Sequence, residues 1–245
     1  MVIGGQFVFD AYDRKARLVP ALLAIAPLFL VLVLRMDEWP FLAKLGSAAV
    51  ALGGLWLLTD VARSMGKSKE AQLYRSWGGK PSVQLLRHSN AEVDGFTKMR
   101  YHACLSKKTG TAMPTPAEEN DDPRQADARY DSASRWLLDN TRDKARFPLL
   151  ASENITYGFR RNGYGIRAVG LLICALTFLW GLVGAPLHQP DALLEFVSRP
   201  KTAVSLLICV VMAVLWLAYF RATTVRTAAF TYANELLRSC ERLAI

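Results

Sequence analysis

The chain has 245 residues, of which 52% are hydrophobic and 21% charged, with a mean hydropathy of +0.16 and a formal charge of +9. These averages resemble those of a soluble protein. Most of the apolar residues, however, lie in four uncharged runs at 18–34, 45–59, 168–189 and 202–220. Because the rest of the sequence is highly charged, this distribution excludes a soluble single domain.

The four runs predict transmembrane helices, each of which needs about 20 apolar residues to cross the hydrocarbon layer. The third and fourth runs meet that length. The first run is followed by Trp39, which lies at the expected membrane interface. The second run is long enough if it starts at Phe41 and the side chain of Lys44 extends back to the headgroups. A buried core helix of a soluble domain is the alternative for the second run. We therefore predict an all-α, polytopic membrane protein whose four transmembrane helices form two hairpins.

The distribution of cations predicts the orientation in the membrane. Of 30 Lys and Arg residues, 26 lie in 1–17, 61–167 and 221–245. By the positive-inside rule both termini and the central segment face the cytoplasm, beneath a bacterial inner membrane. The predicted organisation is a cytoplasmic segment 1–17, transmembrane hairpins 18–60 and 168–220, a basic cytoplasmic helical domain 61–167, and a cytoplasmic C-terminal helix 221–245.

Breakers and caps divide the cytoplasmic segments into helices. We expect the helix of the second span to continue to Trp77, where Gly78, Gly79 and Pro81 end it, and the fourth span to continue without a break through Leu243.

Between these long helices the sequence predicts helices at 82–88, 94–107 and 123–144. A loop over 109–122, rich in Thr, Pro and acidic residues, is expected to be disordered. Ser152 is expected to cap the helix that leads into the third span.

The central segment has a strong positive charge. Residues 61–167 contain 19 Lys or Arg against 12 Asp or Glu, a net charge of +7. Topogenesis and attraction to anionic lipid headgroups explain this charge most simply. A basic pocket for an anionic cytosolic ligand, such as a nucleotide, is the alternative, with nucleic acid as a more indirect partner.

Two motifs stand out at the expected membrane surface. The first is Trp77-Gly78-Gly79-Lys80-Pro81, which either contacts an anion through glycine amides or simply ends a helix. The second, Tyr157-Gly158-Phe159-Arg160-Arg161-Asn162-Gly163-Tyr164-Gly165-Ile166-Arg167, is typical of an interfacial anchor and alternatively of a gating hinge. The predicted ligand-binding or partner-binding residues are Arg75, Trp77, Lys80, Arg160 and Arg161.

Few residues suggest catalysis or metal binding. His88, His102 and Cys104 are the candidates, but on a helix His102 and Cys104 point about 200° apart. No hydrolase, metalloprotease or phosphate-loop motif is present. We predict no catalytic residue, no metal and no cofactor. The four cysteines are expected to be reduced. The enzymatic alternative uses His88 or His102 as a base, oriented by a carboxylate such as Asp94.

The predicted spans contain no charged residue near the membrane midplane, which argues against a secondary transporter. The second span has a surface of small residues, Gly46, Ala49, Gly53 and Gly54, that permits close helix packing within or between subunits. We therefore expect a homo-oligomer.

The motifs at 73–81 and 157–162, together with the order hairpin, insert, hairpin, resemble small four-span bacterial membrane proteins encoded among anti-phage defence genes. The resemblance implies an effector that perturbs the inner membrane, or a sensor that passes a signal to a cytosolic partner.

The sequence thus favours a non-enzymatic, oligomeric inner-membrane effector or sensor, with antiviral defence as the implied context. A cytosolic signal, either a protein or an anionic ligand, would control it. The alternatives are a membrane-embedded enzyme acting on a lipid or an anionic substrate, and a scaffold subunit of an envelope complex.

Overall fold

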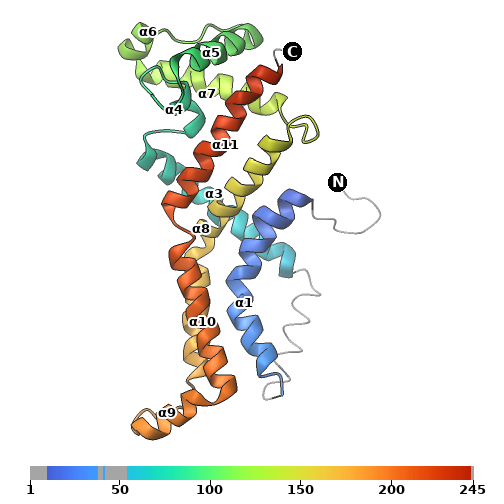
Figure 1. The fold of residues 1–245 in the computed structure, drawn as a ribbon, viewed down its shortest axis with the longest axis vertical. Coiled ribbons are helices and arrows are strands. Elements are labelled where there is room, and N and C mark those ends of the chain that lie inside the picture. The colour runs from blue at the N-terminus through green and yellow to red at the C-terminus, as the bar shows by residue number, and fades with distance from the viewer. Residues whose placement is uncertain (1–9, 38–40, 42–53, 244–245) are drawn as a thin grey trace. The chain divides into compact units, whose positions relative to one another are not determined.

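The computed structural model describes residues 10–37, 41 and 54–243, and every regular element among them is helical. In chain order these elements are η1 (Asp13–Leu18), α1 (Val19–Leu34), α3 (Gly54–Trp77), α4 (Pro81–Leu86), α5 (Gly95–Thr109), α6 (Pro116–Asp121), α7 (Pro123–Asn140), α8 (Pro148–Gly181), α9 (Pro190–Ser198), α10 (Pro200–Ala218) and α11 (Ala222–Leu243) (Figure 1). The predicted all-α class is confirmed for these residues.

The helices form two compact units. The first unit comprises Met1–Lys69 and Gly158–Thr224, and the second comprises Glu70–Tyr157 and Val225–Ile245. The boundaries fall inside α3, α8 and α11, so three helices contribute residues to both units.

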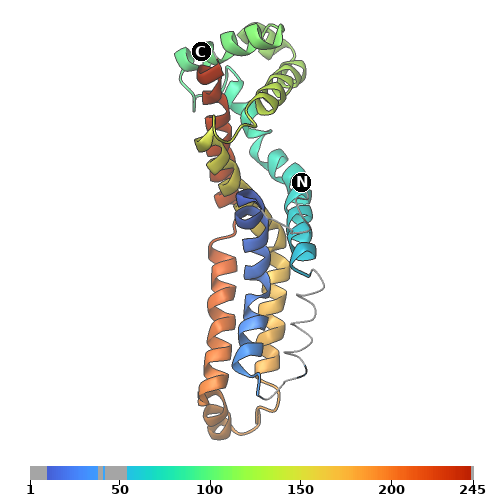
Figure 2. The same ribbon diagram turned by 90° about the vertical axis from the view of Figure 1, so that its right-hand side faces the viewer.

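The helices that are long and apolar enough to cross a membrane lie wholly or mainly in the first unit. Within the described residues these are Asp13–Leu34, Pro148–Gly181 and Pro200–Ala218. Figures 1 and 2 show α1, α10 and the C-terminal part of α8 side by side, with α10 antiparallel to the other two. Their outer surfaces carry large exposed apolar side chains, among them Phe29 and Leu207 at 58% and 61% exposure.

Three of the four predicted spans therefore coincide with helices of suitable length and composition. Of the predicted second span, residues 45–53 lie outside the described residues, and the remainder is the start of α3.

Small residues allow the helices of the first unit to pack closely. A side chain at Gly163 would overlap the ring of Phe220, and one at Gly170 would overlap the ring of Trp216. Both rings are fully buried in the core of this unit. The Tyr157–Arg167 motif, one of whose two predicted roles was a hinge, is unbroken helix within α8, and these glycines serve close packing.

The predicted continuous helix from the fourth span through Leu243 is wrong. The helix α10 ends at Ala218 and α11 begins at Ala222. The buried Phe220 ring packs 4.6 Å from Trp216 and 5.5 Å from Phe159, between ring centroids. The hydroxyl of Thr224 accepts a hydrogen bond from Arg221 N and so caps the next helix. Tertiary packing and a local cap thus break a segment that contains neither glycine nor proline.

The second unit has its own apolar core, built mainly from α4, α5, α7 and α11. Its buried members are Val83, Leu85, Leu86, Val93, Tyr101, Leu105, Met113, Ala126, Tyr130, Ala133, Leu137, Phe147, Leu150, Ala233, Leu236, Leu237 and Cys240. On α7, Tyr130, Ser134 and Leu137 are buried, whereas Leu138 is 40% exposed.

The predicted disorder over 109–122 is also wrong. Residues Pro116–Asp121 form α6, and Thr115 caps it in a reciprocal capping box with Glu118. The side chain of Glu119 attaches α6 to the rest of the second unit: it is buried, with 7% exposure, and accepts hydrogen bonds from Tyr130 and from the backbone of His88. The polar composition of this segment predicted a disordered loop, but the hydrogen bonds of the Glu119 carboxylate order it.

The helix leading into the third span begins earlier than expected. Pro148 occupies the first turn of α8, so Ser152 lies inside the helix and does not cap it. Proline is well suited to a first turn, where its missing N–H has no helical partner in any case.

Candidate binding cavity

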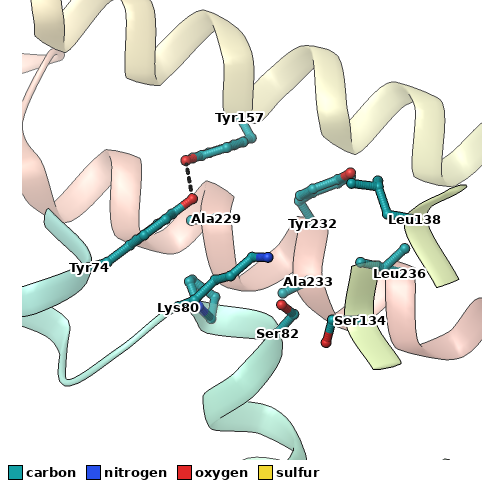
Figure 3. A pocket seen from close by; sticks show the side chains of 11 residues that line it. Tyr74, Lys80, Ser82, Ser134, Leu138, Tyr157, Ala229, Tyr232, Ala233 and Leu236 are labelled. Carbon is teal, nitrogen blue, oxygen red and sulfur yellow. Dashed lines mark hydrogen bonds between the residues drawn. The ribbon is translucent and has the colours of Figure 1, made fainter. Parts of the chain in front are cut away.

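A cavity in the second unit brings together residues from α3, α4, α7, α8 and α11 (Figure 3). It offers about 60 Å³ to water-sized molecules. Aromatic, small aliphatic and hydroxyl side chains surround it: Tyr74, Lys80, Pro81, Ser82, Ser134, Leu138, Tyr157, Ala229, Tyr232, Ala233 and Leu236.

One wall of the cavity is a chain of hydrogen bonds between tyrosines. The hydroxyl of Tyr157 donates to Glu70 Oε1 at 2.8 Å and lies 3.0 Å from the hydroxyl of Tyr74. Since the single proton of Tyr157 goes to Glu70, Tyr74 is the donor in the tyrosine pair. Burial raises the pKa of Tyr157, and the neighbouring Tyr74 and Glu70 raise it further. The Tyr157 hydroxyl therefore stays protonated at neutral pH, and the two hydrogen bonds fix the Tyr157 and Tyr74 rings.

The ring of Tyr157 also stacks on Tyr232, with 6.0 Å between centroids and 6° between planes. This offset stack joins α8 to α11 within the second unit. The aromatic walls are thus held by both ring stacking and hydrogen bonding.

The turn that leads into the cavity is a helix C-cap. Gly79 N donates to Tyr74 O at 2.8 Å and Gly78 N to Arg75 O at 3.3 Å, and both glycines have positive φ. This is a Schellman arrangement, in which glycine amides satisfy the last carbonyls of a helix. The motif thus ends α3, and its two glycine amides are already bonded to helix carbonyls, which favours the helix-ending interpretation over contact with an anion.

The cation at the cavity edge forms an ion pair with an acid that also binds a second cation. Lys80 Nζ lies 2.8 Å from Asp131 Oδ1, and Arg135 pairs with Asp131 Oδ2. Burial raises the pKa of Asp131, but hydrogen bonds and attraction from Lys80 and Arg135 outweigh this, so the pKa lies below its ordinary value. The Asp131 carboxylate is therefore ionised at neutral pH and holds Lys80 in an ion pair at the cavity edge.

Two serine hydroxyls at the cavity have no hydrogen-bond partner in the structure. Ser82 on α4 is 4% exposed and Ser134 on α7 is 1% exposed, and the Oγ atoms of both are buried. A buried hydroxyl without a partner costs roughly 1–3 kcal/mol. Figure 3 shows Ser82 Oγ beside Ala233. The two serine hydroxyls can therefore still form hydrogen bonds with a bound molecule.

The five residues predicted to bind a ligand or partner divide between the two units. In the second unit Arg75 is exposed, Lys80 lies at the cavity edge, and the Trp77 ring packs 5.8 Å from Tyr74 and 6.4 Å from Phe230, between centroids. Arg160 and Arg161 belong to the first unit.

The two arginines are engaged inside the first unit. Arg160 Nη1 donates to Thr224 O at 3.1 Å, and its guanidinium lies 5.9 Å from the centre of the Tyr219 ring. Arg161 is 6% exposed and donates through Nε and Nη2 to Asn162 Oδ1. Of the predicted helix-packing residues, Gly46, Ala49 and Gly53 lie outside the described residues, and Gly54 is the first residue of α3.

His88 and His102 lie against each other in the second unit. The rings of His88 and His102 are 4.8 Å apart between centroids and nearly perpendicular. Nε2 of His88 bonds to Pro114 O and Nε2 of His102 to Leu86 O, each at 2.8 Å. Since a carbonyl only accepts, each Nε2 carries a proton. Burial lowers the pKa of His102, which favours its neutral form.

Asp94 does not orient either histidine as the enzymatic alternative expected. Its carboxylate accepts from Thr97 N at 2.9 Å and caps α5. Within the residues that the structure describes, no group of three or more His, Cys, Asp or Glu residues is placed to hold a metal ion. Cys104 Sγ donates to Cys240 O at 3.4 Å, and all four cysteines are free thiols.

The sequence did not single out the serines, Tyr232 or Glu119. The available signal for Ser134 was its helical spacing from Tyr130 and Leu137 on the same predicted helix. Comparison with protein-family models, curated proteins and solved structures found no match to this chain.

Proposed function

We propose that this protein is a non-enzymatic, multi-pass membrane sensor or effector whose second unit receives a cytosolic signal and whose first unit responds in the membrane. The observation that carries the proposal is the presence, in one chain, of membrane-length apolar helices and of a separately cored helical unit with a cavity. The buried hydroxyls give that cavity a reason to accept a ligand.

The proposed topology places four spans in a bacterial inner membrane, with both termini and residues 61–167 in the cytoplasm. The distribution of cations supports it. Reporter fusions at residue 120 and at residue 245 test it: both report a cytoplasmic location if it holds, and a periplasmic signal at either position contradicts it.

The sensor role predicts that cytosolic material changes the second unit. Full-length protein in lipid nanodiscs is mixed with cytosolic fractions separated by size, and hydrogen exchange is followed by mass spectrometry. We expect one fraction to slow exchange in peptides that contain Tyr74 and Tyr157. Unchanged exchange with every fraction contradicts the sensor role. Dye release from vesicles with the active fraction then separates a pore-forming effector from a sensor that acts through a partner.

Homo-oligomerisation belongs to the same proposal and is supported by the apolar outer surface of the first unit. Mass measurement of the nanodisc complexes tests it directly. The defence context rests on the two sequence motifs alone.

The enzymatic alternative has weaker support. The contact between His88 and His102 favours it, but the cavity in Figure 3 is lined by neither residue. A base would have to act through a ring Nδ1, since each Nε2 proton is held by a carbonyl.

A further inference from the structure

We propose that the cavity binds a small uncharged molecule whose body is mostly apolar and which carries one hydroxyl group, rather than an anion. This inference rests on the proposed function, because it specifies the chemistry of the signal that the second unit would receive.

Charge is the first argument. The cation that lines the cavity, Lys80, is paired at 2.8 Å with Asp131. The amides of Gly78 and Gly79 are bonded to helix carbonyls. An anion would have to break the ion pair or share its cation, whereas a neutral molecule leaves it intact.

Hydrogen bonding is the second argument. Ser82 and Ser134 present two unpartnered buried hydroxyls from neighbouring helices. Each can donate one hydrogen bond and accept others. A ligand hydroxyl has the same double capacity, so it can form a hydrogen bond with a serine of the cavity wall. A purely apolar ligand would leave them unsatisfied.

Size and lining are the third argument. The space of about 60 Å³ corresponds to about four water-sized spheres. Ala229 and Ala233 from α11 form one side, and the rings of Tyr74, Tyr157 and Tyr232 form another. The space therefore takes an apolar group of a few heavy atoms.

The test uses two small fluorinated probes of similar size. Fluorine NMR titrations of full-length protein in nanodiscs are made with 2,2,2-trifluoroethanol, which is neutral and carries a hydroxyl, and with trifluoroacetate, which is an anion. Empty nanodiscs supply the correction for lipid partitioning. We expect saturable binding of trifluoroethanol that is at least about tenfold tighter than binding of trifluoroacetate, because only the alcohol leaves the ion pair undisturbed.

Substitutions locate the binding. Ser82→Ala and Ser134→Ala should each weaken trifluoroethanol binding by about 3- to 10-fold, the value of one hydrogen bond. Each should also raise the unfolding temperature of the ligand-free protein, since a buried hydroxyl without a partner is removed. Ser152→Ala, which removes an exposed hydroxyl on α8, is the matched control and should change neither quantity.

Three results overturn the inference: no saturable binding of trifluoroethanol, equal or tighter binding of trifluoroacetate, or trifluoroethanol binding that survives both serine substitutions unchanged. The comparison of probes on the unmodified protein stands even if a variant fails to fold. If trifluoroacetate binds more tightly and Lys80→Ala abolishes this, the ligand class is wrong but a cytosolic ligand remains. The size-fractionated exchange experiment decides the proposed function separately.

Discussion

Replacement of Glu119 by Gln should destabilise the second unit strongly. Its Oε2 accepts from His88 N and Tyr130 Oη, both at 2.8 Å, and its Oε1 accepts from the backbone N and the hydroxyl of Ser89 at 3.1 and 3.0 Å. Glutamine keeps one acceptor oxygen, so an NH₂ group must face one of the two backbone N–H donors. An unsatisfied buried donor costs roughly 1–3 kcal/mol, and the lost charge weakens the remaining bonds. We expect a loss of about 2–4 kcal/mol.

Hydrogen exchange of full-length protein in nanodiscs measures this loss where it occurs. Peptides covering α6 should exchange faster in Glu119→Gln, by about 30- to 1000-fold if exchange follows the opening free energy. Glu92→Gln is the control, because Glu92 is half exposed and lies 3.9 Å from Arg226, a surface pair worth little. Exchange in α6 that is equal in the two variants would refute the assigned role of Glu119.

The same carboxylate predicts a dependence on pH. Burial raises the pKa of Glu119, but hydrogen bonds from His88, Ser89 and Tyr130 outweigh this, and the pKa lies below its ordinary value of 4.5. A lowered folded-state pKa stabilises the fold at pH values above the unfolded pKa, and this contribution is lost as the pH falls through the folded value. The stability difference between wild type and Glu119→Gln should therefore be constant from pH 7 to about pH 5 and shrink below pH 4.5. A difference that grows on acidification would show the opposite sign of the shift.

Two further predictions concern close packing and the cavity. Gly163→Ala should destabilise the first unit by about 1–3 kcal/mol, because the added Cβ would overlap the Phe220 ring. Gly95→Ala is the control: nothing lies within 4 Å of its Cβ, so it should stabilise the protein by about 0.5 kcal/mol. Thermal unfolding in nanodiscs compares the two variants, and equal shifts of the unfolding temperature would contradict the packing argument. Asp131→Asn should make the cavity bind trifluoroacetate more tightly than trifluoroethanol, because the substitution leaves Lys80 without its carboxylate. If the fluorine titration shows an unchanged preference, the ion pair does not determine the charge of the ligand that the cavity accepts.

Local chemistry was sufficient to predict most helix ends. Trp77 ends α3 because the next two residues are glycines with positive φ. Gly110 ends α5 in the same conformation, and Asp94 caps its start. Proline at a first turn correctly placed the start of α7. These features act within a few residues, so the sequence alone contains the information.

Long-range contacts explain the failures. Nothing within 218–222 forbids a helix, and the break there accompanies the burial of the Phe220 ring against Gly163, which lies 57 residues earlier, on α8. Likewise, α6 is ordered by the bonds of Glu119 to His88 and Tyr130. Such partners lie up to 57 residues away along the chain, beyond the reach of composition or periodicity.

The cavity shows the same division between local and distant information. The sequence indicated Lys80 through its cationic turn, but the charge of that turn depends on Asp131, 51 residues later. A positive residue read in isolation predicts an anionic ligand. Placed beside its carboxylate, with two unpartnered hydroxyls among the residues that line the cavity, the same residue favours a neutral one. We therefore expect the local charge that remains after internal pairing, and not the net charge of +7 over residues 61–167, to determine which ligand this cavity accepts.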